Sequence, residues 1–225
     1  MAHIAFPQSC KRFKTPSSSS TYSYVHIPPA SSKPTILFLH GFPSSSYDWR
    51  HQISHFSSLG YGVLVPDLLG YGDTDKPTSP ADYNGKKMAT EVIDILDHEK
   101  LDKVHAVGHD FGSHLLSRVV NYFPSRLQSC TFIVAPYAPP GQPFDLDTLK
   151  ELTEKAVGFE KLGYMRFLGR EDSPEILNAH VCDVSTHFLP IVPLPSVRSG
   201  RTHPLPGNFS SLLPLSIHDF FFPHH

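Results

Sequence analysis

The chain has 225 residues and a formal net charge of −2, a length that suits one α/β domain with a substantial core. A charge this close to zero predicts neither a nucleic acid partner nor binding to an anionic membrane. The three cysteines, Cys10, Cys130 and Cys182, are odd in number and have no metal or redox spacing, which fits a reducing, cytoplasmic location. No apolar run approaches the roughly 18 residues of a membrane span, and we expect no signal peptide.

Strand patterns dominate the first third of the chain. Residues 9–15 and 21–27 alternate enough to predict two strands joined by a serine-rich hairpin loop. The continuous apolar run 35–39 is typical of a strand with both faces covered. A helix is expected over about 46–59, and Gly62 to Pro66 predicts the next strand.

Helices and strands then alternate. A helix is predicted over about 86–99, with Met88, Val92 and Leu96 on its buried face. Residues 104–123 predict a strand, a sharp turn and a helix. Residues 129–135 predict one more strand. This rhythm is typical of a doubly wound, mostly parallel α/β sheet, in which ligands bind beyond the carboxyl ends of the strands.

The remaining sequence changes character twice. Residues from about 145 to 180 are helical in pattern without strands, which predicts a small cap over the site. After Val181 the chain is rich in proline and histidine and has neither helical nor strand periodicity. We therefore expect a core over 1–140, a partial helical cap over 141–180 and a disordered tail over 181–225, with the sheet truncated after about its sixth strand.

The sharp turn holds the most informative motif, Gly108-His109-Asp110-Phe111-Gly112. A turn this tight forces its central residue into a strained backbone conformation, and the flanking glycines leave room for it. The result would raise Asp110 above the sheet at a helix N-terminus, where backbone N–H groups favour negative charge. A carboxylate in the place usual for a serine nucleophile points to attack on a saturated carbon or an epoxide ring.

Three motifs together resemble the epoxide hydrolase branch of the α/β-hydrolase family. They are His40-Gly41-Phe42-Pro43, Gly70-Tyr71-Gly72-Asp73-Thr74-Asp75-Lys76-Pro77, and Gly108-His109-Asp110-Phe111-Gly112. Each stands at a predicted strand end, and the resemblance covers about residues 20–180.

The resemblance implies a role for each motif. Asp110 would be the nucleophile that opens the epoxide as a covalent ester, and the N–H groups of Phe42 and Phe111 would form an oxyanion hole. Tyr164 would donate its phenol proton toward the epoxide oxygen. The Phe42–Pro43 bond would be cis. The remaining motif residues would support the site structurally: His40, Gly41, Pro43, Gly108, His109 and Gly112.

The chain departs from the family pattern in its second half. The family hydrolyses the ester with a late histidine oriented by an acid, and uses a second cap tyrosine; no tyrosine follows Tyr164, and no late histidine follows a strand pattern. We therefore expect impaired catalysis. The alternative is an inactive, truncated hydrolase that acts as a small-molecule binding module. Haloalkane and fluoroacetate dehalogenases are less similar, because they place tryptophan or arginine where Phe111 stands.

The substrate implied is a small apolar epoxide, with water and side chains sufficient for the reaction, so no cofactor or metal is expected. His51 and His55 have helical i, i+4 spacing but no acidic or third ligand nearby in the pattern, which argues against zinc. The oligomeric state is left open by the sequence.

Overall fold

The computed structural model describes residues 2–30, 32–141 and 145–179, so the tail expected over 181–225 lies outside the described residues. The strands are β1 (Cys10–Lys14), β2 (Thr21–Ile27), β3 (Thr35–Leu39), β4 (Gly62–Pro66), β5 (Val104–His109) and β6 (Leu127–Ile133). The α-helices are α1 (Ala2–Ala5), α2 (Arg50–Ser58), α3 (Gly85–His98), α4 (Phe111–Tyr122), α5 (Leu146–Val157), α6 (Gly163–Leu168) and α7 (Ser173–Ala179). Short 3-10 helices are η1 (Ser46–Trp49), η2 (Pro80–Tyr83) and η3 (Pro124–Arg126).

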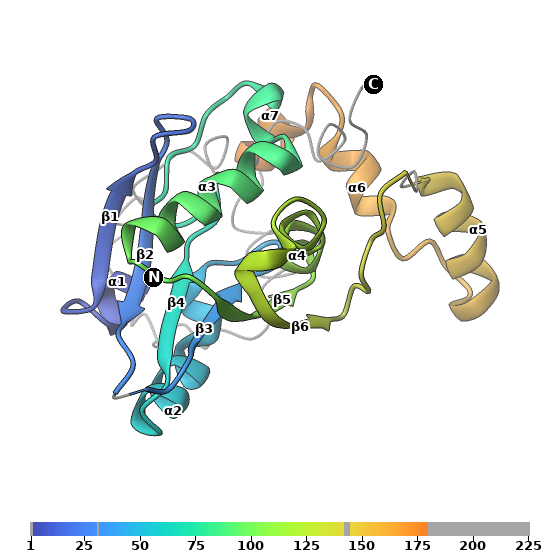
Figure 1. The fold of residues 1–225 in the computed structure, drawn as a ribbon. Coiled ribbons are helices and arrows are strands. Elements are labelled where there is room, and N and C mark those ends of the chain that lie inside the picture. Colours follow the sequence, from blue (N-terminus) through green and yellow to red (C-terminus); the bar gives the residue numbers. More distant parts are fainter. Residues whose placement is uncertain (1, 31, 142–144, 180–225) are drawn as a thin grey trace, which may run out of the picture.

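The strands form one sheet in the order β1-β2-β4-β3-β5-β6 (Figure 1). β1 and β2 pair antiparallel, as do β2 and β4, whereas β4, β3, β5 and β6 run parallel. Parallel neighbours deliver their carboxyl ends to one edge of the sheet. The loops after β3, β4 and β5 therefore meet at that edge, as the doubly wound pattern predicts.

Two apolar clusters cover opposite faces of the sheet. Leu37 and Leu39 of β3 belong to the larger cluster with residues of α3 and α4, whereas Ile36 and Phe38 belong to a smaller cluster with Trp49 and Ile53. Because successive side chains of a strand point to opposite faces, α2 lies on one side of the sheet and α3 and α4 on the other. This double coverage explains why residues 35–39 are all apolar and all buried.

The observed elements follow the sequence predictions with small shifts. The helix expected over 46–59 begins as a 3-10 turn before α2, and the strand expected over 129–135 lies two residues earlier, as β6. Alternation was expected in 21–27, but five consecutive residues of β2 are buried. The reason is that both faces of β2 are covered: Tyr22 and Tyr24 pack in the larger cluster, and Val25 packs in the smaller one.

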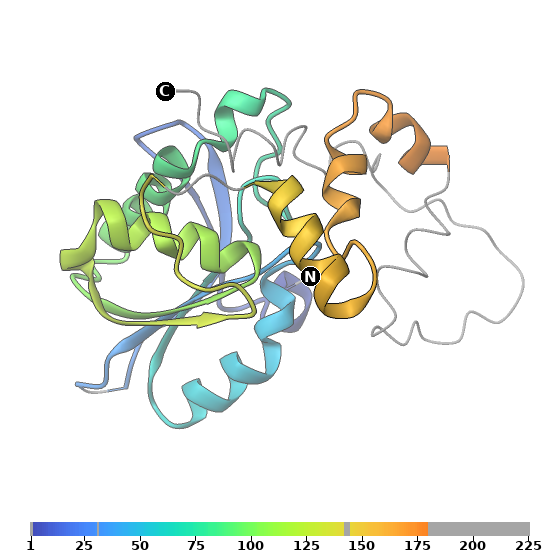
Figure 2. The same ribbon diagram turned by 90° about the vertical axis from the view of Figure 1, so that its right-hand side faces the viewer.

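The described residues after β6 form three helices, α5, α6 and α7, and no strand, and the helices lie to one side of the sheet (Figures 1 and 2). α5 has no buried residue, whereas Met165 of α6 packs against the larger core cluster. The division into core and cap stays a prediction.

Within the described ranges, no helix has the length and apolar character needed to cross a membrane. No group of three or more histidine, cysteine or acidic residues in the same ranges could hold a metal ion, and His51 and His55 are exposed.

Candidate active site

Asp110 occupies a sharp turn between β5 and α4. Its φ of 51° and ψ of −115° are rare for a residue with a side chain, a strain of about 1–3 kcal/mol that the surrounding structure must hold. The Asp110 N–H donates to the carbonyl of Ile133 at 3.0 Å, and the Ser113 hydroxyl donates to the carbonyl of Gly108 at 2.8 Å. These bonds tie the turn to the ends of β5 and β6.

Glycine is required on both sides of Asp110 because the backbone packs tightly there. A Cβ at Gly112 would lie 2.2 Å from the carbonyl oxygen of Leu39, and one at Gly108 would lie 2.5 Å from that of Gly112. The first contact presses the start of α4 against the end of β3. Asp110 is therefore brought directly beside the loop that follows β3.

That loop supplies a hydrogen bond to the carboxylate. The backbone N–H of Phe42 donates to Asp110 Oδ1 at 3.0 Å, and the Phe42–Pro43 peptide bond is cis. A Cβ at Gly41 would lie only 2.8 Å from the Cβ of Asp110, so the loop approaches the turn as closely as a glycine permits. The structure thus brings Phe42 and Asp110 together. Phe111 follows as the first residue of α4, with its ring in the larger core cluster.

His40 holds the same loop from beneath. The ring is fully buried; its Nε2 accepts from the N–H of Leu68 at 2.9 Å, and its Nδ1 lies 2.9 Å from the carbonyl oxygen of Gly41. Burial lowers the pKa of His40, which keeps the imidazole neutral and able to accept at Nε2. Both ring nitrogens are engaged in positioning backbone. His109 lies toward the other face of the sheet, where its ring meets Trp49 edge to face at 6.5 Å.

Tyr164 of α6 reaches the same region from the helices after β6. Its ring stacks on that of Phe42 with 6.1 Å between centroids and 4° between planes. Burial raises the pKa of Tyr164, and the negative charge of Asp110 raises it further. The phenol therefore remains a proton donor near the carboxylate.

Sequence reasoning missed a second phenol at this site. Tyr71, between β4 and η2, packs edge to face on the ring of His40 at 5.2 Å and tilts against Phe111 at 6.4 Å. It belongs to a motif that carries the family resemblance, and its aromatic type beside two glycines was the signal available. Its position beside the Asp110 turn depends on packing between segments that are far apart in the sequence.

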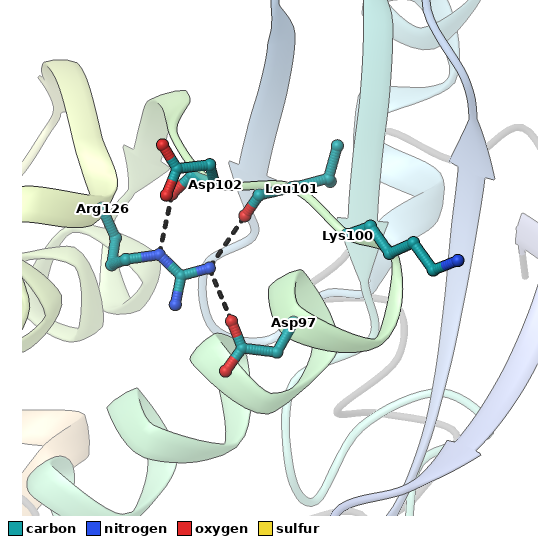
Figure 3. A pocket seen from close by; sticks show the side chains of 5 residues that line it. All are labelled: Asp97, Lys100, Leu101, Asp102 and Arg126. Atoms are coloured by element: carbon teal, nitrogen blue, oxygen red, sulfur yellow. Dashed lines mark hydrogen bonds and ion pairs between the residues drawn. The ribbon is translucent and has the colours of Figure 1, made fainter.

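A pocket elsewhere in the molecule is lined by Asp97, Lys100, Leu101, Asp102 and Arg126 (Figure 3). The pocket lies at the amino end of β5, whereas Asp110 follows the carboxyl end of β5, so the two regions lie at opposite ends of this strand. Arg126 donates to the carbonyls of Asp102 and Leu101 at 2.7 and 2.8 Å and pairs with Asp97 at 2.7 Å. These contacts account for the guanidinium as a clamp between η3 and the loop before β5.

Comparison with known proteins decides the family. The family model described as the alpha/beta hydrolase fold matches residues 34–165, more than half of the chain. The chain belongs to the α/β-hydrolase family. It is 40% identical over 105 residues to an epoxide hydrolase 2 of Siraitia grosvenorii, covering 47% of this chain and 33% of that protein. It is 33% identical over 170 residues to the epoxide hydrolase srdG of Neurospora crassa, covering 72% and 48% respectively.

Solved structures agree with this placement. Epoxide hydrolase VrEH1 from Vigna radiata superposes with a TM-score of 0.67 at 26% identity, covering 84% of this chain and 62% of that one. These curated relatives and this solved structure are all named as epoxide hydrolases. The matches to the two curated relatives span a third and about half of their length.

Proposed function

We propose that this α/β-hydrolase opens a small apolar epoxide by nucleophilic attack of Asp110, forming a covalent aspartyl ester. The observation that carries the proposal is the hydrogen bond from the Phe42 N–H to Asp110 Oδ1, at the N-terminus of α4 and beside the Phe42 ring on which Tyr164 stacks. It orients the carboxylate and leaves its charge in a site where helix N–H groups favour an anion. The names of the relatives, epoxide hydrolases, support the same chemistry.

In this mechanism the carboxylate oxygen that does not bind Phe42 attacks a ring carbon of the epoxide. The carbon–oxygen bond of the ring breaks, and its electron pair passes to the epoxide oxygen. The Tyr164 phenol hydrogen-bonds that oxygen and supplies the proton, and the resulting phenolate is reprotonated from water. The product of this step is a hydroxyalkyl ester of Asp110.

Hydrolysis of the ester to a diol needs a base to activate water, with the N–H groups of Phe42 and Phe111 binding the oxyanion. Two histidine–carboxylate pairs occur in the described part of the chain, His3 with Asp73 and His26 with Glu99. Neither includes a residue of the Asp110 turn, the Phe42 loop or α6. We propose that the ester forms faster than it is hydrolysed and accumulates.

Intact-mass measurement after incubation with styrene oxide, a small apolar epoxide, tests the proposal. We expect one adduct per chain, with the added mass of one epoxide, located by peptide mapping on Asp110. Styrene diol, which lacks the epoxide ring, should add no mass to the chain. Chains that remain unmodified without releasing diol would refute ring opening, whereas many turnovers without adduct would refute ester accumulation alone.

The pH dependence of adduct formation reports on Tyr164. Because the pKa of this phenol is raised above its usual 10.0, the proton donor should persist from neutral pH up to that value. We therefore expect a rate that does not fall between neutral pH and pH 10, measured by quenched intact-mass time courses. The Tyr164→Phe variant should react more slowly, by about 100-fold, throughout this range. A decline of the wild-type rate well below pH 10 would contradict the role assigned to Tyr164.

A further inference from the structure

Tyr71 is fixed in place by a tight turn at the carboxyl edge of the sheet. Its N–H donates to the carbonyl of Leu68 at 2.9 Å, and its carbonyl accepts from Thr74 N–H at 3.1 Å. The flanking Gly70 and Gly72 have φ values of 90° and 52°, which allow the chain to reverse on both sides of the ring. The turn thus holds the Tyr71 backbone at this edge of the sheet.

The Tyr71 hydroxyl differs from those of the other buried tyrosines. Tyr22 donates to Glu91 at 2.6 Å, Tyr24 to Glu99 at 2.5 Å, and Tyr83 to the carbonyl of Pro77 at 2.8 Å. Within the described ranges, the Tyr71 hydroxyl makes no hydrogen bond, although the residue is only 5% exposed. A buried phenol normally has a partner, so this one is available to a bound molecule.

The hydroxyl is also open to that molecule. Buried side-chain atoms without a hydrogen bond lie, in the described ranges, on His3, His26 and Trp49, and the Tyr71 oxygen is not among them. The small accessible part of this residue therefore includes its polar end. The contacts of the Tyr71 ring with His40 and Phe111 place this side chain beside the Asp110 turn, and the charge of Asp110 acts on its phenol.

Burial and the neighbouring groups keep the Tyr71 phenol protonated. Burial raises its pKa most, and the neighbouring Tyr83, Asp110 and Tyr164 raise it further. Asp110 raises the pKa of Tyr164 in the same way, so both phenols are held protonated by the same carboxylate. At neutral pH the Tyr71 hydroxyl is a hydrogen-bond donor beside a carboxylate nucleophile.

We propose that Tyr71 is a further catalytic residue, whose hydroxyl donates a hydrogen bond to the oxygen of the bound epoxide opposite Tyr164. The inference rests on the proposed ring opening by Asp110. Tyr164 transfers the proton, while Tyr71 stabilises the negative charge that develops on the same oxygen and remains neutral. This second phenol comes from the turn after β4, whereas Tyr164 comes from α6.

The Tyr71→Phe variant tests this role, because it removes the hydroxyl and keeps the ring. We expect adduct formation with styrene oxide to slow by about 100-fold, the effect of losing one donor to a developing oxyanion. Tyr83→Phe is the matched control: it also deletes a buried phenol oxygen, but one already bonded to Pro77, and its rate should stay within about twofold of wild type.

A second electrophile separates donation from positioning. Phenacyl bromide alkylates a carboxylate with release of bromide, which needs no proton donor, so Tyr71→Phe should react with it at the wild-type rate. Equal slowing with both reagents would show that the hydroxyl positions Asp110 and would overturn the donor role. An unchanged epoxide rate in Tyr71→Phe would overturn the inference while leaving ring opening by Asp110 standing. A wild-type chain that forms no epoxide adduct would overturn the proposed function itself.

Discussion

Replacing Asp110 with asparagine should abolish the covalent adduct with styrene oxide while leaving the fold intact. The amide oxygen of asparagine can still accept from the Phe42 N–H, and asparagine tolerates a positive φ better than most residues. What is lost is the anionic oxygen that attacks the ring. Intact-mass spectra after long incubation should show only unmodified chain, and thermal unfolding should match that of the wild type.

The matched control for this variant is Asp145→Asn. Asp145 is also an aspartate at a helix N-terminus, where its carboxylate accepts from the N–H groups of Asp147 and Thr148, but it is exposed to solvent. This variant should form the adduct at the wild-type rate. An Asp110→Asn chain that still gained the mass of one epoxide would place the nucleophile elsewhere and remove the basis of the proposed mechanism.

The order of strands and helices could be predicted because each depends on local pattern. The apolar run 35–39 indicated a strand covered on both faces, and the stripe of Met88, Val92 and Leu96 indicated the buried face of α3. The alternating pattern of 21–27 predicted the wrong burial, because the burial of this strand depends on the elements packed against it. Both faces of β2 are covered by elements distant in the sequence, a long-range property that alternation within seven residues does not record.

The residues of the candidate site likewise fall into those that local motifs indicate and those that only the three-dimensional packing reveals. Asp110 and Phe42 belong to short motifs whose glycines reveal the close packing of the backbone. Tyr71 also stood in such a motif, but its free hydroxyl could be recognised only by comparison with the satisfied hydroxyls of Tyr22 and Tyr83. The late histidines of the sequence all follow residue 179 and lie outside the described residues.

Asp67 joins the loops at the carboxyl edge of the sheet, and its removal should strongly destabilise the fold. The side chain is 2% exposed; Oδ1 accepts from the N–H and hydroxyl of Ser46 at 2.8 and 2.6 Å, and Oδ2 accepts from the N–H of Asp73 at 3.1 Å. Gly72 also packs directly against this carboxylate, since a Cβ at Gly72 would lie 2.1 Å from Asp67 Oδ2. One carboxylate thus connects the segment after β3 with the turn that carries Tyr71.

The Asp67→Ala variant would leave these donors buried without an acceptor. Hydrogen bonds to a charged group contribute about 1.5–3 kcal/mol each, and unsatisfied buried donors add their own cost, so we expect the free energy of unfolding to fall by about 3–4 kcal/mol. Equilibrium urea denaturation, with the slope checked for two-state behaviour, measures this change.

Asp94→Ala provides the matched control for that loss. Asp94 also accepts from the N–H and the hydroxyl of one serine, Ser17, at 3.1 and 2.5 Å, but these bonds are exposed to solvent. Water can replace the lost acceptor there, so the expected change is below about 1 kcal/mol. If the two variants were equally stable, burial would not be what makes the Asp67 contacts strong. The loops that hold Phe42 and Tyr71 would then owe their positions to backbone packing at the glycines.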